Sequence, residues 1–271
     1  MSAVSRLSRA ALVAGLVAAL PAAASAWPAE TMTAVGRDAR RLLPRSLARL
    51  LGERETQIQD EVARFPPALT RALAEDLPTG RLRPETLAAL SAEVDRTVAL
   101  FHERRVGEGL VRLGGLLRIS ADLSDPVLAV GPEGWPPGLS REYYALFAAN
   151  LDKMPVVLDD PKALQLTRGQ LPQLWQTLVD RSREQVPTIR GEFFRDGRVV
   201  SHARLDYRSP AWAVAALAYS RAVTATAATW LAAWRAAHGD STRTGRARVV
   251  APQDAPAPSL AQDRPPRPEA P

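Results

Sequence analysis

Apolar residues of this 271-residue chain recur at three- and four-residue spacing, and this periodicity constrains its fold more than any other feature. The longest periodic run covers residues 84–123, begins at Pro84 and is interrupted by Gly107 and Gly109, which predicts two consecutive helices. Further helices are expected at 30–51 with a restart at Pro44, through 58–62, and at 68–75, 139–152, 161–186 and 210–238. The pattern predicts an all-α fold built as a single helical bundle.

Three segments qualify this helical pattern. Residues 126–138 hold four Pro and three Gly, which predicts a loop. The one strand signal covers 192–200, where Asp196-Gly197 is typical of a hairpin turn. The 210–238 helix is apolar nearly all round and is expected at the centre of the bundle, because Arg221 and several Thr argue against a membrane span.

The two ends of the chain differ from the region between them. Residues 1–26 combine Arg6 and Arg9, an apolar run at 10–20 and an Ala-Ser-Ala site, which predicts a cleavable signal peptide and a mature chain beginning at Trp27. An uncleaved membrane anchor is the alternative interpretation. Residues 239–271 are rich in Pro and poor in apolar residues, which predicts a disordered tail. The expected product is an exported, periplasmic or secreted protein with one domain at 27–238 and no transmembrane span after cleavage.

Composition excludes several function classes. The chain has no Cys, so disulfides and a lipid-modified Cys are excluded. The formal net charge is +6, but basic and acidic residues are interleaved, so no nucleic-acid partner is expected. His102, His202 and His238 are far apart, and none has a ligand-type spacing with an acidic residue. The sequence carries no signal for the oligomeric state.

One segment resembles a known family. Residues 113–128 resemble the core motif of the zinc-dependent phospholipases C and the related single-strand-specific zinc nucleases. The family pattern is Leu-Gly, then His, three residues, Asp, five residues and His, with Pro two residues before the second His. Asp122 falls on the family Asp and Pro126 on the family Pro, but Arg118 and Leu128 stand at the two His positions.

The resemblance extends to other ligand positions of the family. Its mature chain begins with a Trp whose amino group and carbonyl bind zinc, and Trp27 is similar to that residue. Met32 stands where the family has His, and Pro67 where it has a second Asp. The best match to a later family pair, His and Glu, is Arg141 and Ala145. The resemblance thus implies a helical bundle of the zinc-dependent phospholipase C type in which only Trp27 and Asp122 of the ligand set survive.

This loss of ligands leads to a hypothesis about the pocket. A zinc cluster needs several neutral imidazoles and carboxylates, and a guanidinium cannot replace them. No cofactor is therefore expected. We expect Arg118 and Arg141 to occupy the space of the metal and to compensate the charge of Asp122, while Met32 and Leu128 fill the remaining volume. A simpler interpretation is that Arg118 and Asp122 form an exposed i,i+4 salt bridge.

Three functions are compatible with the sequence. The first is an exported, non-catalytic relative of the family whose Arg-lined former metal pocket binds a phospholipid headgroup or another anionic small molecule. The second is an active metal-dependent phosphodiester hydrolase, with a reduced site built from Asp122, Trp27 and carboxylates such as Asp125, Asp159 or Asp160. The third is a helical envelope protein, unrelated to the family, that binds a partner through its Arg faces and Pro-rich tail.

Overall fold

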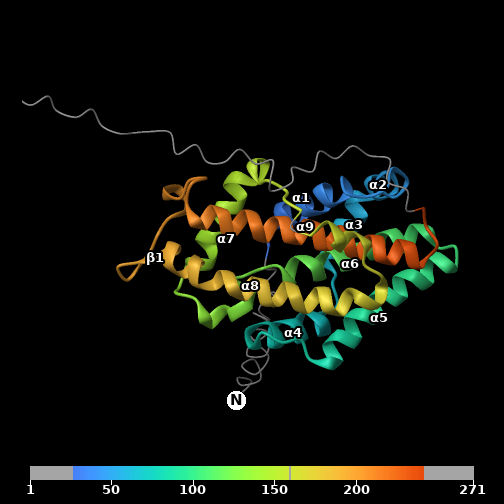
Figure 1. Ribbon diagram of the computed structural model, residues 1–271, viewed down its shortest axis with the longest axis horizontal. Helices are drawn as coiled ribbons and strands as arrows, with labels where there is room; N and C mark the ends of the chain where they lie inside the picture. Colours follow the sequence, from blue (N-terminus) through green and yellow to red (C-terminus); the bar gives the residue numbers. More distant parts are fainter. Residues whose placement is uncertain (1–26, 159, 241–271) are drawn as a thin grey trace, which may run out of the picture.

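A computed structural model describes residues 27–158 and 160–240 of the chain (Figure 1). The predicted signal peptide, Asp159 and residues 241–271 of the predicted tail lie outside the described residues. The expectations for these segments stay predictions.

The described residues form an all-α fold, which confirms the predicted fold class. A two-stranded antiparallel hairpin, β1 (Phe194–Arg195) and β2 (Arg198–Val199), projects at one end (Figure 1). The α-helices are α1 (Ala29–Arg40), α2 (Arg45–Gly52), α3 (Glu55–Ala63), α4 (Pro67–Asp76), α5 (Pro84–His102), α6 (Val106–Leu123), α7 (Leu139–Asn150), α8 (Leu171–Phe193) and α9 (Pro210–Ala236). Short 3₁₀ helices join them: η1 (Leu77–Thr79), η2 (Leu128–Val130), η3 (Pro132–Gly134), η4 (Leu151–Lys153), η5 (Pro161–Gln165), η6 (Arg168–Gln170) and η7 (His202–Arg204).

Helix α9 lies at the centre of the bundle, as its apolar sequence predicts. It packs against α1, α5, α6 and α8, and α6 and α8 run beside it in Figure 1. The many Ala residues of α9 let these helices approach closely, and the Nε1–H of Trp230 donates a hydrogen bond of 2.8 Å to the carbonyl of Leu113 on α6. No helix in the described part of the chain is long and apolar enough to cross a membrane.

The approach of α3 to α6 requires a glycine. A Cβ at position 114 would lie 2.5 Å from the carbonyl oxygen of Ile58 on α3, far inside van der Waals contact. Gly114 belongs to the Leu-Gly pair of the motif-like segment. Its role in this chain follows from the packing of two helix backbones.

Element boundaries differ from the predictions in two places. Helix α5 ends at His102 and α6 starts at Val106, so Gly107 and Gly109 lie inside α6; the break is made by Arg104, whose φ of 61° is left-handed. The predicted helix at 161–186 divides into η5, η6 and α8, and α8 continues through Pro187 to Phe193. The hairpin turn is confirmed, with positive φ at both Asp196 and Gly197.

Candidate functional site

Arg118 and Asp122 form a buried ion pair on α6. The Nε of Arg118 lies 2.6 Å from Oδ2 of Asp122, and the two residues are 6% and 3% exposed. The direct i,i+4 pairing is therefore confirmed. The interpretation as an exposed salt bridge is wrong, because every residue of α6 from Leu116 to Leu123 is buried, and α1, α8 and α9 all pack against this helix.

A second buried acid follows α6 directly. One carboxylate oxygen of Asp125 accepts the N–H of Val127 at 2.8 Å, and the other accepts the hydroxyl of Tyr144 on α7 at 2.8 Å. Burial raises the pKa of Asp125 to about 7, although both hydrogen bonds oppose this rise. Burial also raises the pKa of Asp122, against the attraction of Arg118. Arg118, Asp122, Asp125 and Tyr144 are called the buried cluster below.

Three of the other predicted site residues line the interior beside α1, η2 and α7. Trp27 is fully buried, and its ring centre lies 4.7 Å from that of Phe147 on α7. Met32, on α1, belongs to the hydrophobic core of the bundle. Leu128, in η2, is half-buried and packs against that core. Ala145, on α7, is half-buried as well. Pro67 is the first residue of α4, a position where proline is favoured.

Arg141 does not join the buried cluster, so the expected placement of its guanidinium beside Asp122 is wrong. Its side chain is 80% exposed, and its nearest acidic partner is Glu142, at 3.6 Å. Tyr143 and Phe147 define the buried face of α7. Arg141 precedes Tyr143 by two residues, about 200° around a helix, and therefore lies on the opposite face.

The donor groups around Asp122 do not fit a zinc cluster. Arg118 stands where the resemblance expects a His ligand; its guanidinium offers no lone pair to a metal ion, and it already bonds one oxygen of Asp122. Among residues 27–158 and 160–240, no group of three or more His, Cys, Asp or Glu side chains could hold a metal ion. Asp160, one of the carboxylates expected in a reduced metal site, lines a different cavity, and Asp159 lies outside the described residues.

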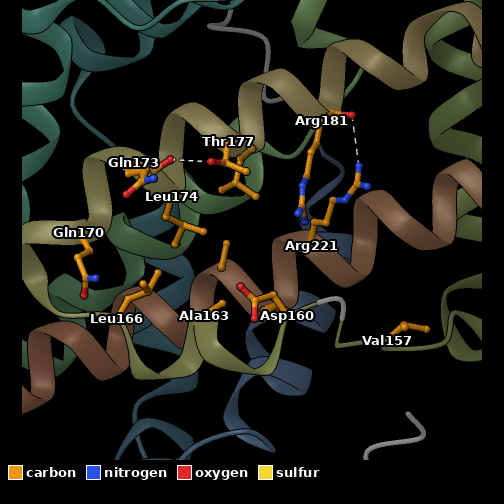
Figure 2. A pocket seen from close by; sticks show the side chains of 13 residues that line it. Val157, Asp160, Ala163, Leu166, Gln170, Gln173, Leu174, Thr177, Arg181 and Arg221 are labelled. Atoms are coloured by element: carbon orange, nitrogen blue, oxygen red, sulfur yellow. Dashed lines mark hydrogen bonds between the residues drawn. The ribbon is translucent and has the colours of Figure 1, made fainter. Parts of the chain in front are cut away.

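That cavity lies between α8, α9 and η5 (Figure 2) and has a volume of about 230 Å³. Its apolar wall includes Leu166, Leu174, Leu178 and Ala225. Polar and charged side chains complete the lining, and a hollow that combines apolar surface with polar groups is typical of small-molecule sites.

Two arginines enter one end of this cavity from opposite helices. In Figure 2, Arg181 extends from α8 towards α9, and Arg221 extends from α9 towards the backbone of α8, where its Nη1 donates to the carbonyl of Arg181 at 3.3 Å. Both side chains are half-buried and already have interaction partners. A bound anion would therefore share the two guanidinium groups with those partners. Asp160, also on the wall, accepts the N–H of Lys162 at 2.9 Å and caps η5.

A polar group in the wall is left unsatisfied. Thr224 is 8% exposed, and its hydroxyl has no hydrogen-bond partner among the described residues. A buried hydroxyl without a partner costs free energy, and a ligand that bonds to it would recover that cost. Thr224 therefore belongs to the polar part of the cavity lining, with Asp160 and the two arginines.

The sequence contains one signal for this cavity. Arg221 lies in the middle of a mostly apolar helix, whose other charged residue is Arg235 in the last turn, and a charge in such a place needs either a polar environment or a partner. Most of the other lining residues come from α8 and from the segment 157–170, and no local pattern brings these together with α9. Comparison with protein-family models, curated proteins and solved structures gave no match to this chain.

Proposed function

We propose that this protein is an exported, non-catalytic binding protein, and that the cavity between α8 and α9 takes up a small anionic molecule with an apolar part. One observation carries the proposal: Arg181 and Arg221 enter the same end of a cavity whose remaining wall is largely apolar. The class of ligand is that expected from the sequence, an anion held by arginines. The site differs, because Arg141 is exposed and Arg118 is bonded to Asp122.

The charge of the lining favours an anion. Among the described residues that line the cavity, Arg181 and Arg221 carry guanidinium groups and Asp160 carries a carboxylate, so their formal charges sum to a positive value. Both arginines are half-buried, where electrostatic attraction is stronger than at an exposed surface. Guanidinium groups also bind carboxylates and phosphates with two parallel hydrogen bonds.

The apolar wall selects the rest of the ligand. Leu174, Leu178 and Ala225 offer aliphatic contacts away from the arginines, and burial of a hydrocarbon portion there gains about 25 cal/mol per Å². A short-chain carboxylate, sulfonate or phosphate ester has this combination of groups.

A relation to the zinc phospholipases C is a second part of the proposal. Trp27 and Asp122, the two positions that match ligands of that family, are both buried, and they lie on segments packed near α7. Hydrolysis with a reduced metal site is not favoured, because its expected carboxylates are apart: Asp122 is bonded to Arg118, and Asp160 lines the cavity between α8 and α9.

The proposal is tested with 1-anilinonaphthalene-8-sulfonate, a fluorescent anion with an apolar body. We expect saturable binding of one dye per chain, competed by decanoate more strongly than by inorganic phosphate. Arg221→Gln keeps a side-chain N–H for the carbonyl of Arg181 but removes the charge, and should weaken binding about tenfold or more. Arg181→Gln should act similarly, and Ala225→Leu should block the cavity.

Arg141→Gln is the matched control, since it removes one positive charge from an exposed position. It should leave dye affinity unchanged. Equal affinity in the wild type and both cavity Arg variants, with all three folded by circular dichroism, would contradict the proposed site.

A further inference from the structure

Two of the three histidines meet at one end of the bundle although they are far apart in the sequence. His102 is the last residue of α5, and His238 lies two residues after the end of α9. Their ring centres are 5.6 Å apart, with an angle of 61° between the planes. Both side chains are exposed, so a solute can reach them.

The packing beneath the two rings holds them in place. Phe101 and Trp234, from the last turns of α5 and α9, contact each other edge to face with ring centres 5.5 Å apart. The chain after α9 is also ordered, because the N–H of His238 donates to the carbonyl of Arg235 at 2.9 Å, and that of Gly239 to Trp234 at 2.8 Å. His238 itself has a left-handed φ of 58°. The two imidazoles are therefore presented on a fixed base.

Both rings lie at the C-terminal ends of helices, α5 and α9, where the helix dipole attracts a cation. Arg104 and Arg105, which follow α5, oppose this attraction, so the affinity for a metal ion depends on the two imidazoles. Imidazole nitrogens are common ligands for zinc, copper and nickel ions.

The spacing of the rings also fits a shared metal ion. With metal–nitrogen distances of about 2.0–2.1 Å, two imidazoles on one tetrahedral ion have ring centres about 5 Å apart. The observed 5.6 Å needs only a small rotation of exposed side chains to reach this arrangement. A contact between two exposed imidazole rings adds little to the stability of the fold. If it were only a contact, adding metal ions would not change the unfolding temperature.

We propose that His102 and His238 form a binding site for a first-row transition-metal dication, with water completing the coordination. The site is distinct from the cavity between α8 and α9 and from the buried cluster. Metal bound there links the C-terminal ends of α5 and α9, which raises the stability of the folded chain.

The test is a titration of the untagged full chain with ZnCl₂ and CuCl₂, followed by calorimetry and by thermal unfolding. We expect one ion per chain, an unfolding temperature that rises with metal and returns with EDTA, and tighter binding of Cu²⁺ than of Zn²⁺. His102→Gln and His238→Gln should each weaken zinc binding at least about tenfold. His102→Cys supplies a thiolate ligand and should retain zinc binding.

His202→Gln is the matched control. His202 contacts Glu142 through Nδ1 at 2.8 Å and lies in η7, and its loss should leave metal affinity unchanged. The proposal is overturned if the wild type binds neither ion, or if the His102→Gln and His238→Gln variants bind zinc as tightly as the wild type. Dye binding in the α8–α9 cavity is measured in parallel and should not change in either variant, which separates this site from the proposed function.

Discussion

The buried cluster at the end of α6 and the cavity between α8 and α9 use the same residue types in opposite ways. Arg118 and Asp122 are 6% and 3% exposed and are bonded to each other at 2.6 Å. Arg181 and Arg221 are half-buried beside a cavity of about 230 Å³. An arginine in the first region neutralises a charge of the protein itself. In the second region, two arginines and one acid, Asp160, are the charged residues among the described lining of a cavity, and the proposed function assigns the two arginines to an anionic ligand.

The difference shows that enclosure decides what an arginine does. A buried charge must be paired inside the protein, since the loss of hydration is otherwise uncompensated. A charge at the mouth of a cavity keeps part of its hydration and can exchange water for an anion. The following predictions test this contrast, in order of decreasing effect.

The largest effect is expected from Arg118→Met. The change leaves the Asp122 carboxyl buried without its partner and should lower the free energy of unfolding by about 3–5 kcal/mol in urea denaturation. The double variant Arg118→Met with Asp122→Leu removes both charges and should recover most of this loss. Arg221→Met, in the open cavity, should cost much less. Equal losses at positions 118 and 221 would remove the distinction between the two regions.

The next effect concerns the pH dependence of stability. The pKa of Asp125 is raised from 3.8 to about 7, so the folded state binds a proton more tightly than the unfolded state. The free energy of unfolding should therefore fall as pH rises from about 4 to about 7 and then level off. Asp125→Asn keeps acceptor and donor groups for Val127 and Tyr144 and should reduce this fall by on the order of 3 kcal/mol.

Urea denaturation at several pH values measures this slope. Asp152→Asn, at an exposed position, is the control and should leave the slope unchanged. A slope as steep in Asp125→Asn as in the wild type would show that Asp125 is not a titrating group of the buried cluster.

The smallest effect is expected in the cavity wall. Thr224→Val removes a buried hydroxyl that has no partner and should raise the free energy of unfolding by about 1 kcal/mol. Thr177→Val is the comparison, because the Thr177 hydroxyl donates to the carbonyl of Gln173 at 2.9 Å. A Thr224→Val variant less stable than the wild type would indicate that the hydroxyl is hydrogen-bonded to ordered water.

The sequence predicted helices more reliably than their ends or their surroundings. Apolar periodicity located α1 to α9 because each helix buries one face, and Asp196-Gly197 located the hairpin. It placed the α5–α6 break at Gly107 and Gly109. The break occurs at Arg104, and both glycines lie inside α6, where Gly109 permits the close approach of the Phe101 ring.

The buried cluster was predicted in part, and the cavity between α8 and α9 was not. The i,i+4 spacing was sufficient to predict the contact between Arg118 and Asp122, because it depends on one helix alone. The placement of Arg141 in the pocket came from the resemblance and was wrong, because the position of Arg141 on the outer face of α7 depends on which side of that helix meets the core. The cavity was not predicted, because its walls come from three separate segments.

The sequence alone thus determined the all-α class, the central place of α9 and the Arg118–Asp122 contact. These properties depend on the spacing of residues within single helices. Only the tertiary structure decided that this ion pair is enclosed, that Arg181 and Arg221 share an open cavity, and that His102 meets His238. Burial and contacts between distant segments depend on how helices pack around one another, and periodicity within one helix does not specify its neighbours.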